Sequence, residues 1–113
     1  MKNYHISHFA DVAPTKCPCG TTKRAFADIP GSPASIHIVE ISKDAKVHYH
    51  RKMTEIYLIL EGEGYMELDG EKIPVKPMTT IMIKPGCRHR AVGNFKLVNI
   101  PVPAFDESDE YFD

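Results

Sequence analysis

The sequence predicts an all-β protein in which the short strands of a single domain close into a jelly-roll-like barrel. The chain has 113 residues, enough for one domain with one modest core. Short apolar runs recur at regular spacing between Gly, Pro and Asp turns, which is typical of a sandwich or barrel. No long segment combines a helical period with capping residues. A single open sheet would expose too much of the 42% hydrophobic content, which favours the barrel.

The chain divides into three parts by composition. Residues 1–35 are expected to form an irregular N-terminal arm with edge strands, because APTKCPCGTT and DIPGSPAS are rich in turn formers. Residues 36–103 are expected to form the barrel. Residues 104–113 form an acidic C-terminal tail that also carries aromatic side chains.

Several runs in the barrel part are predicted as strands because they are β-branched or apolar and are bounded by turn residues. Asp69-Gly70 lies between two strand-like runs and predicts a two-residue hairpin turn. The predicted strand regions are 36–41, 55–60, 65–73 (the hairpin), 79–84 and 95–102.

Charge and hydropathy exclude several classes of partner. The net charge of -1 and the pI of about 6.6 give no basic field for nucleic acid or an anionic membrane surface. The longest strictly apolar run, 56–60, is far shorter than the roughly 20 residues of a membrane helix. The start, MKNYHISHF, has no apolar signal region, and the three cysteines do not suggest a disulfide framework. We therefore expect a cytoplasmic protein.

Two histidines and a glutamate precede one of the predicted strands. His48 and His50 are two residues apart, so in an extended segment both rings share one face, roughly 6.6 Å apart along the chain. Four residues separate His50 from Glu55, a length that suits a hairpin connection, and Tyr57 shares the side-chain parity of Glu55. His89, just beyond a Pro-Gly turn, is the best candidate for a further ligand. First-row metals accept mixed imidazole and carboxylate ligands, so this spacing predicts a metal site.

The other histidines have simpler explanations. A lone histidine is more often a surface or hydrogen-bonded core residue than a ligand, and we assign His5, His8 and His37 to that group. Cys17 and Cys19 could join His5 and His8 around a zinc ion. Zinc sites usually space their cysteines C-x2–4-C, however, and only one residue lies between these two, which favours ordinary thiols in a turn.

These residues resemble the cupin superfamily. HYHRKMTEIYLILEG, residues 48–62, matches its first motif, H-x-H-x3–4-E-x6-G, at every position, although Ser42 replaces the leading glycine. GCRH, residues 86–89, matches the G-x2-H portion of the second motif. Met78, Pro85 and Gly93 depart from that motif at turn positions and not at ligand positions.

The resemblance implies a double-stranded β-helix, that is, a small jelly-roll barrel, covering about residues 36–102. It implies one divalent transition metal ion held inside by His48, His50, Glu55 and His89. Fe, Mn, Ni, Co, Zn and Cu all suit such a set, and the sequence does not distinguish them. Small cupins of this kind often form homodimers, and the N-terminal arm and the tail are candidates for that contact.

Two classes of function remain open. The first is a metal-dependent enzyme acting on a small polar molecule, either a dioxygenase or a sugar isomerase or epimerase, since the motif region also resembles the cupin module of mannose-6-phosphate isomerases. Glu55 could then act as general base and Tyr57 could contact the substrate. A sugar phosphate would need cations near the mouth of the barrel, and the sequence offers Arg51, Lys52, Arg88 and Arg90. The alternative is that the arginines, which flank an inward histidine, form a solvated face. The second class is a binding module that holds a metal or small ligand without turnover.

Overall fold

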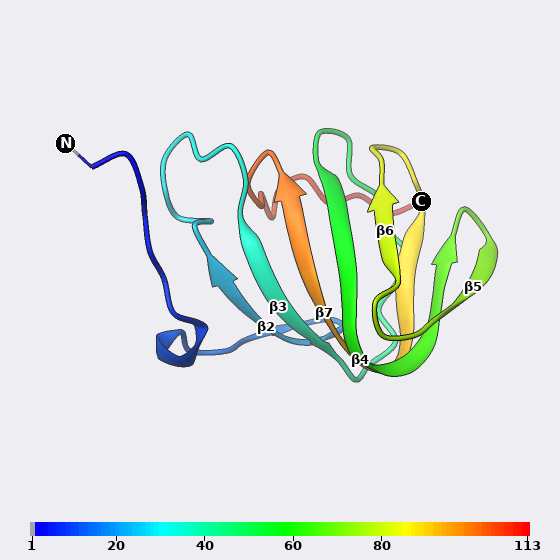
Figure 1. The fold of residues 1–113 in the computed structure, drawn as a ribbon. Helices are drawn as coiled ribbons and strands as arrows, with labels where there is room; N and C mark the ends of the chain where they lie inside the picture. The colour runs from blue at the N-terminus through cyan, green and yellow to red at the C-terminus, as the bar shows by residue number, and fades with distance from the viewer. Residues whose placement is uncertain (1) are drawn as a thin grey trace.

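The computed structural model describes residues 2–113, which form one antiparallel sheet of seven strands folded over on itself (Figure 1). The sheet order is β1-β2-β3-β7-β4-β5, and β6 pairs with β4. A short 3-10 turn, η1 (Phe9–Asp11), precedes the strands. The strands are β1 (Thr15–Cys17), β2 (Gly20–Ala25), β3 (Ile36–Ile41), β4 (Thr54–Leu68), β5 (Glu71–Val75), β6 (Thr80–Ile83) and β7 (His89–Val102). The prediction of an all-β fold in a single domain is confirmed.

Two long strands connect the walls of the fold. β4 and β7 pair along their whole lengths, from Thr54 opposite Val102 to Leu68 opposite His89. Both strands turn over near their middle (Figure 1), and there Gly64 lies opposite Gly93. A Cβ atom on Gly64 would lie 2.3 Å from the carbonyl oxygen of Val92, so the backbones approach too closely for a side chain. The ladder therefore continues from one wall into the other, with one shift in register between Ile59 and Glu61.

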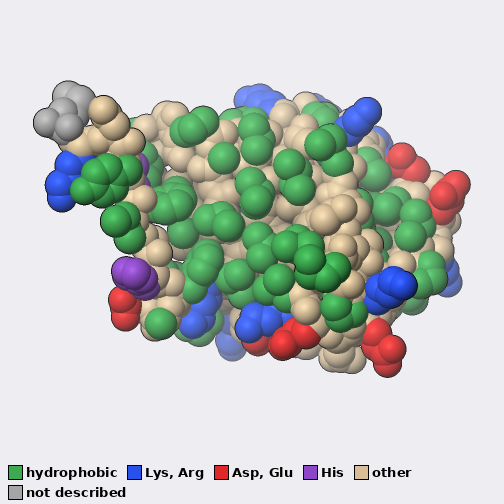
Figure 2. Space-filling model, viewed as in Figure 1, with side chains coloured by type: hydrophobic (Ala, Val, Ile, Leu, Met, Phe, Trp, Pro, Cys, Tyr) green, Lys and Arg blue, Asp and Glu red, His purple; other side chains and the backbone are tan. Residues whose placement is uncertain are grey.

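The core fills the space between these walls. Ile59, Met66 and Leu97 are buried almost completely, and they pack with the residues of β3 and β6 that face inward. Outside, hydrophobic side chains spread over the face formed by the first part of β4 and its neighbours, while most charged side chains lie at the margins (Figure 2). None of the described residues lies in a helix long and apolar enough to cross a membrane.

The predicted strands agree with the structure where local pattern decides them. The 36–41 strand and the Asp69-Gly70 turn are confirmed, and both turn residues have positive φ, 50° and 85°. The predicted break between 55–60 and 65–68 is wrong, because glycines bend β4 without ending it. The hairpin expected between His50 and Glu55 is also wrong. His48 pairs with His89 instead, through an isolated bridge.

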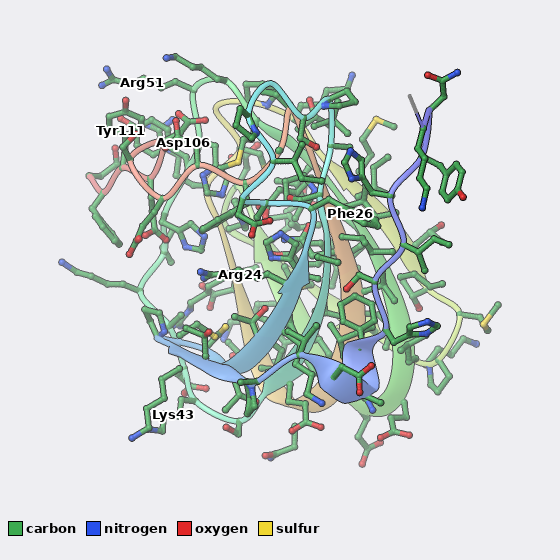
Figure 3. The ribbon with its side chains drawn as sticks, turned by 90° about the vertical axis from the view of Figure 1, so that its left-hand side faces the viewer. Arg24, Phe26, Lys43, Arg51, Asp106 and Tyr111 are labelled. Atoms are coloured by element: carbon green, nitrogen blue, oxygen red, sulfur yellow. The ribbon has the colours of Figure 1, made fainter. Side chains whose placement is uncertain are left out.

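The ends of the chain also contribute to the sheet and the site. β2 pairs along its whole length with β3, so the 1–35 segment supplies part of one wall. The 104–113 tail folds back over the loop before β4, where Tyr111 bridges Tyr49. In Figure 3, Tyr111, Asp106 and Arg51 lie together at one end of the molecule, and Arg24 lies nearer its middle.

Candidate metal centre

Four polar side chains from distant parts of the sequence meet inside the fold. His48 and His50 belong to the loop before β4, Glu55 is the second residue of β4, and His89 begins β7. His48 and His89 exchange both backbone hydrogen bonds, at 3.1 and 2.9 Å, which sets their rings side by side. His50, Glu55 and His89 are buried, with 5%, 4% and 1% of their surfaces exposed. We refer to these four residues as the histidine–carboxylate cluster.

The imidazole rings converge on one point. The ring centroids of His48 and His89 are 4.3 Å apart, and that of His50 is 5.3 Å from each of the other two. One nitrogen from each ring lies within 4.8 Å of the others. Oε1 of Glu55 lies 3.0 Å from Nε2 of His50 and 3.1 Å from Nε2 of His89. Three histidines at this separation could hold a metal ion.

Backbone carbonyls hold all three rings in one orientation. Nδ1 of His48 donates to the Lys46 carbonyl at 3.0 Å, Nδ1 of His89 donates to the Cys87 carbonyl at 2.9 Å, and Nδ1 of His50 donates to the Asp109 carbonyl. A carbonyl oxygen can only accept, so each Nδ1 carries a proton and each ring turns its Nε2 into the cluster, where Nε2 of His89 is hydrogen-bonded to Oε1 of Glu55 at 3.1 Å. Metal-ligating histidines in proteins are oriented in this way.

Oε1 of Glu55 lies within hydrogen-bond distance of two imidazole nitrogens. It is hydrogen-bonded to Nε2 of His89 at 3.1 Å, whereas Nε2 of His50, 3.0 Å away, is buried without a hydrogen-bond partner. Imidazole nitrogens and a carboxylate oxygen lie this close when a proton or a cation is among them. The residues present therefore fit a divalent metal ion.

The protonation states of His48 and Glu55 favour the binding of a cation. Burial lowers the pKa of His48 to about 4, so this ring stays neutral at physiological pH. Burial by itself would raise the pKa of Glu55, but the imidazoles of His50 and His89 hold it well below its usual range. Glu55 is thus ionised and supplies the negative charge that a divalent ion needs.

The cluster forms one wall of a cavity of about 170 Å³. Tyr57 lines the same cavity, as its shared parity with Glu55 predicts. Burial, and then the Glu55 carboxylate, raise the pKa of Tyr57 well above its ordinary value, so its hydroxyl keeps its proton. Oε2 of Glu55 accepts a hydrogen bond from Nδ2 of Asn99 at 2.6 Å, which fixes the plane of the carboxylate.

Sequence reasoning missed Asn99 and Asp109. Asn99 is a polar residue in the apolar 95–102 run, at the same parity as the buried Leu97, and that parity is a signal of an inward polar side chain. Asp109 lies in the acidic tail, where nothing local distinguishes it from its neighbours. Its contribution depends on how the tail folds back.

The other candidates lie outside the cluster. His5 and His8 are exposed, and the one metal-ligating group found among residues 2–113 contains neither of them nor a cysteine. His37 is buried, lines the cavity and bonds Oγ of Ser35 through Nε2 at 2.9 Å. Cys87 is half-buried and packs against the core.

The arginines proposed for phosphate are engaged elsewhere. Arg90 pairs with Glu67 at 2.8 Å, and Arg88 pairs with Asp113 at 2.8 Å. The guanidinium of Arg51 lies over the ring of Tyr111. These contacts favour the interpretation that the three arginines form a solvated face and do not bind phosphate.

Comparison with known proteins agrees with the fold and the motif. Residues 36–98 match the family described as Cupin domain. A solved protein from Planctomyces limnophilus shares 36% identity with a TM-score of 0.89, and the match covers 96% of each chain. The nucleoside dehydratase Pac13, from Streptomyces, shares 18% identity with a TM-score of 0.83 over 96% of this chain and 90% of its own.

One curated relative was also found, an uncharacterized protein of Methanocaldococcus jannaschii. It is 38% identical over 76 residues, which are 64% of this chain. The matched region spans 61% of the length of that relative.

Proposed function

The chain belongs to the cupin family, and from that premise we propose that it is a metal-dependent enzyme acting on a small polar molecule. The observation that carries the proposal is the set of three inward imidazoles beside the Glu55 carboxylate, with Nε2 of His50 buried without a hydrogen bond. One divalent transition metal ion would be held by His48, His50, His89 and Glu55. When bound, such an ion polarises a substrate oxygen as a Lewis acid.

Proton transfer is the chemistry that the surrounding residues support best. Glu55 is ionised and could accept a proton if it leaves the metal, while the hydroxyl of Tyr57, on the same face of β4, stays protonated and can donate a hydrogen bond to a substrate oxygen. A base and a hydrogen-bond donor on one cavity wall suit isomerisation, epimerisation or loss of water next to a carbonyl or hydroxyl group. The fold shared with a nucleoside dehydratase is consistent with this branch. We therefore favour it over dioxygenase chemistry.

A binding module without turnover is the alternative. Such a module would use the same cavity. It would not need Tyr57 close to Glu55, because no proton is transferred. Two assays on metal-loaded protein separate the possibilities: incorporation of solvent deuterium into small hydroxy and keto compounds, followed by NMR, and oxygen consumption. Deuterium incorporation that is lost in Tyr57→Phe supports the proton-transfer enzyme. Oxygen uptake supports a dioxygenase, and neither signal supports the binding module.

Elemental analysis tests the metal site directly. The wild-type protein is compared with His50→Ala, His89→Ala, the double variant and His8→Ala, which removes an exposed histidine as a matched control. We expect near-stoichiometric metal in the wild type and in His8→Ala, and none in the double variant, with all chains folded by circular dichroism. An undiminished metal content in the double variant would refute the assignment of His50 and His89 as ligands.

Two further properties belong to this proposal. We expect a homodimer, and exposed apolar side chains such as Ile6, Met78 and Met82 offer surface for a partner copy. Light scattering after size-exclusion chromatography tests this, since a monomeric mass at all concentrations contradicts it. We also expect the protein in the cytoplasm, which fractionation of the source cells would check.

A further inference from the structure

The cavity is also lined by polar side chains that do not belong to the histidine–carboxylate cluster. Among the described residues, the buried side-chain atoms without a hydrogen-bond partner are Oγ1 of Thr22, Nε of Arg24, Oδ1 of Asn99 and Nε2 of His50. All four of these residues line the same cavity. A metal ion held by the cluster would account for Nε2 of His50. Buried polar atoms in proteins are nearly always partnered, so the other three around one cavity indicate a further polar occupant.

Arg24 is the cation among these side chains. Its guanidinium lies 4.4 Å from the centre of the Phe105 ring and forms no ion pair with a carboxylate of residues 2–113. Arg90 lines the cavity too, but Glu67 holds its guanidinium through two hydrogen bonds. Thr22 and Arg24 are two residues apart on β2, so both side chains face the cavity.

The unpartnered atoms define what the occupant must offer. A guanidinium presents planar donors that match a carboxylate. Nδ2 of Asn99 already donates to Glu55, so Oδ1 of Asn99 needs a donor from the ligand, such as a hydroxyl or an ammonium group. The Thr22 hydroxyl can either donate a hydrogen bond to the ligand or accept one from it. The ligand therefore carries an anionic acceptor at one end and a donor group nearer the cluster.

The volume of the cavity and the charges that line it limit the class of ligand that can bind. A cavity of about 150 Å³ accommodates benzene, so the 170 Å³ available here suits a ligand of roughly six to ten non-hydrogen atoms. Besides Arg24 and Arg90, the charged residues that line it are Lys16, Glu55, Glu107 and Glu110. One free guanidinium near several carboxylates favours a monoanion over a phosphate dianion.

We propose that the cavity binds a small hydroxy- or amino-carboxylate, with the carboxylate on Arg24 and the hydroxyl or ammonium group on Asn99. This inference rests on the proposed function, since it names the substrate class of the same site. It adds Arg24 and Thr22 as binding residues that neither the family motif nor its ligand positions include.

Calorimetric titration of the metal-loaded protein tests the proposal. The probes are L-lactate, L-malate and L-serine, with lactamide as the uncharged match of lactate and inorganic phosphate as a competing anion. The variants are Arg24→Gln, Arg24→Lys and Thr22→Val. Arg90→Gln is the matched control, because it removes an arginine of the same cavity that is already paired. Metal content and melting temperature are measured for each variant.

We expect at least one carboxylate to bind, lactamide to bind far more weakly, and Arg24→Gln to weaken binding about 10- to 100-fold. The affinity of Arg24→Lys should lie between those of the wild type and Arg24→Gln, because a lysine keeps the charge but loses the planar donors. If Arg24→Gln does not fold, Arg24→Lys takes its place in the test. Arg90→Gln should bind within about threefold of the wild type.

The inference would be overturned by no carboxylate binding, by equal binding of lactate and lactamide, or by phosphate as the single anion bound. Equal losses in Arg24→Gln and Arg90→Gln would overturn it too. A protein that takes up no metal refutes the proposed function instead. In that case the same titrations on the metal-free protein still decide whether Arg24 recognises a carboxylate.

Discussion

The imidazole of His50 donates its Nδ1 proton to the backbone carbonyl of Asp109, a residue 59 positions further along the chain. The Asp109 carboxylate turns the other way and accepts the backbone N–H groups of Arg51, Lys52 and Met53 at 2.9 to 3.0 Å. Asp109 is 2% exposed. One residue of the acidic tail therefore orients a candidate ligand and caps the loop that carries it.

Removing this carboxylate should destabilise the protein. Asp109→Ala leaves three N–H groups without an acceptor, and we expect the free energy of unfolding to fall by about 2 to 4 kcal/mol. Asp106→Ala is the control, because Asp106 is exposed and bonds mainly Ser108. Urea denaturation of both variants measures the difference. Similar losses for the two would show that the tail does not clamp the loop.

Metal should stabilise the folded state, because the cluster is assembled only by folding. At a free metal concentration of about 100 times the dissociation constant, the expected gain is about 2.7 kcal/mol. The melting temperature of stripped protein should therefore rise on reconstitution. Glu55→Gln, which keeps the size of the side chain but removes its charge, should show a smaller rise. An unchanged melting temperature for the wild type contradicts tight native binding.

Cys17 should be the reactive thiol of this protein. The hydrogen bond from Cys19 lowers the pKa of Cys17 to about 6, whereas the same contact raises the pKa of Cys19. Burial raises the pKa of Cys87, which provides an internal control. Because the thiolate is the nucleophile, alkylation of Cys17 should accelerate as pH rises through about 6 and then level off.

Mass spectrometry after brief iodoacetamide treatment measures this order of reactivity. At neutral pH, Cys17 should react about tenfold or more faster than Cys87. Cys19→Ser should change the pH midpoint of Cys17 without abolishing its reaction. A Cys17 midpoint near that of an ordinary thiol would rule out the hydrogen-bonded pair.

The close approach of β4 and β7 should tolerate no side chain at Gly64. Gly64→Ala puts a Cβ atom 2.3 Å from the Val92 carbonyl oxygen, and we expect a loss of about 2 to 4 kcal/mol. Gly70→Ala is the comparison. Its φ of +85° carries strain of about 1 kcal/mol, but no atom lies within 4 Å of the added Cβ. If thermal denaturation ranks Gly70→Ala as the more damaging change, the crowded contact is refuted.

Local pattern predicted much of the fold and part of the site. The β-branched run at 36–41 and the Asp69-Gly70 turn depend on neighbouring residues alone, and both are confirmed. The glycines at 62 and 64 read as a break, because sequence does not show whether a glycine ends a ladder or bends it. In the structure the ladder with β7 continues past them.

For the site, the residue types and their spacing can be read from the chain alone: two imidazoles on one face, a carboxylate five residues later and a further histidine after a turn. How these side chains meet depends on the tertiary structure. His48 pairs with His89 and not with β4, Asp109 returns to hold His50, and β2 brings Arg24 to the cavity that Asn99 lines. These contacts join residues far apart in the chain. They depend on strand register and on the path of the tail, and no local pattern encodes either of these.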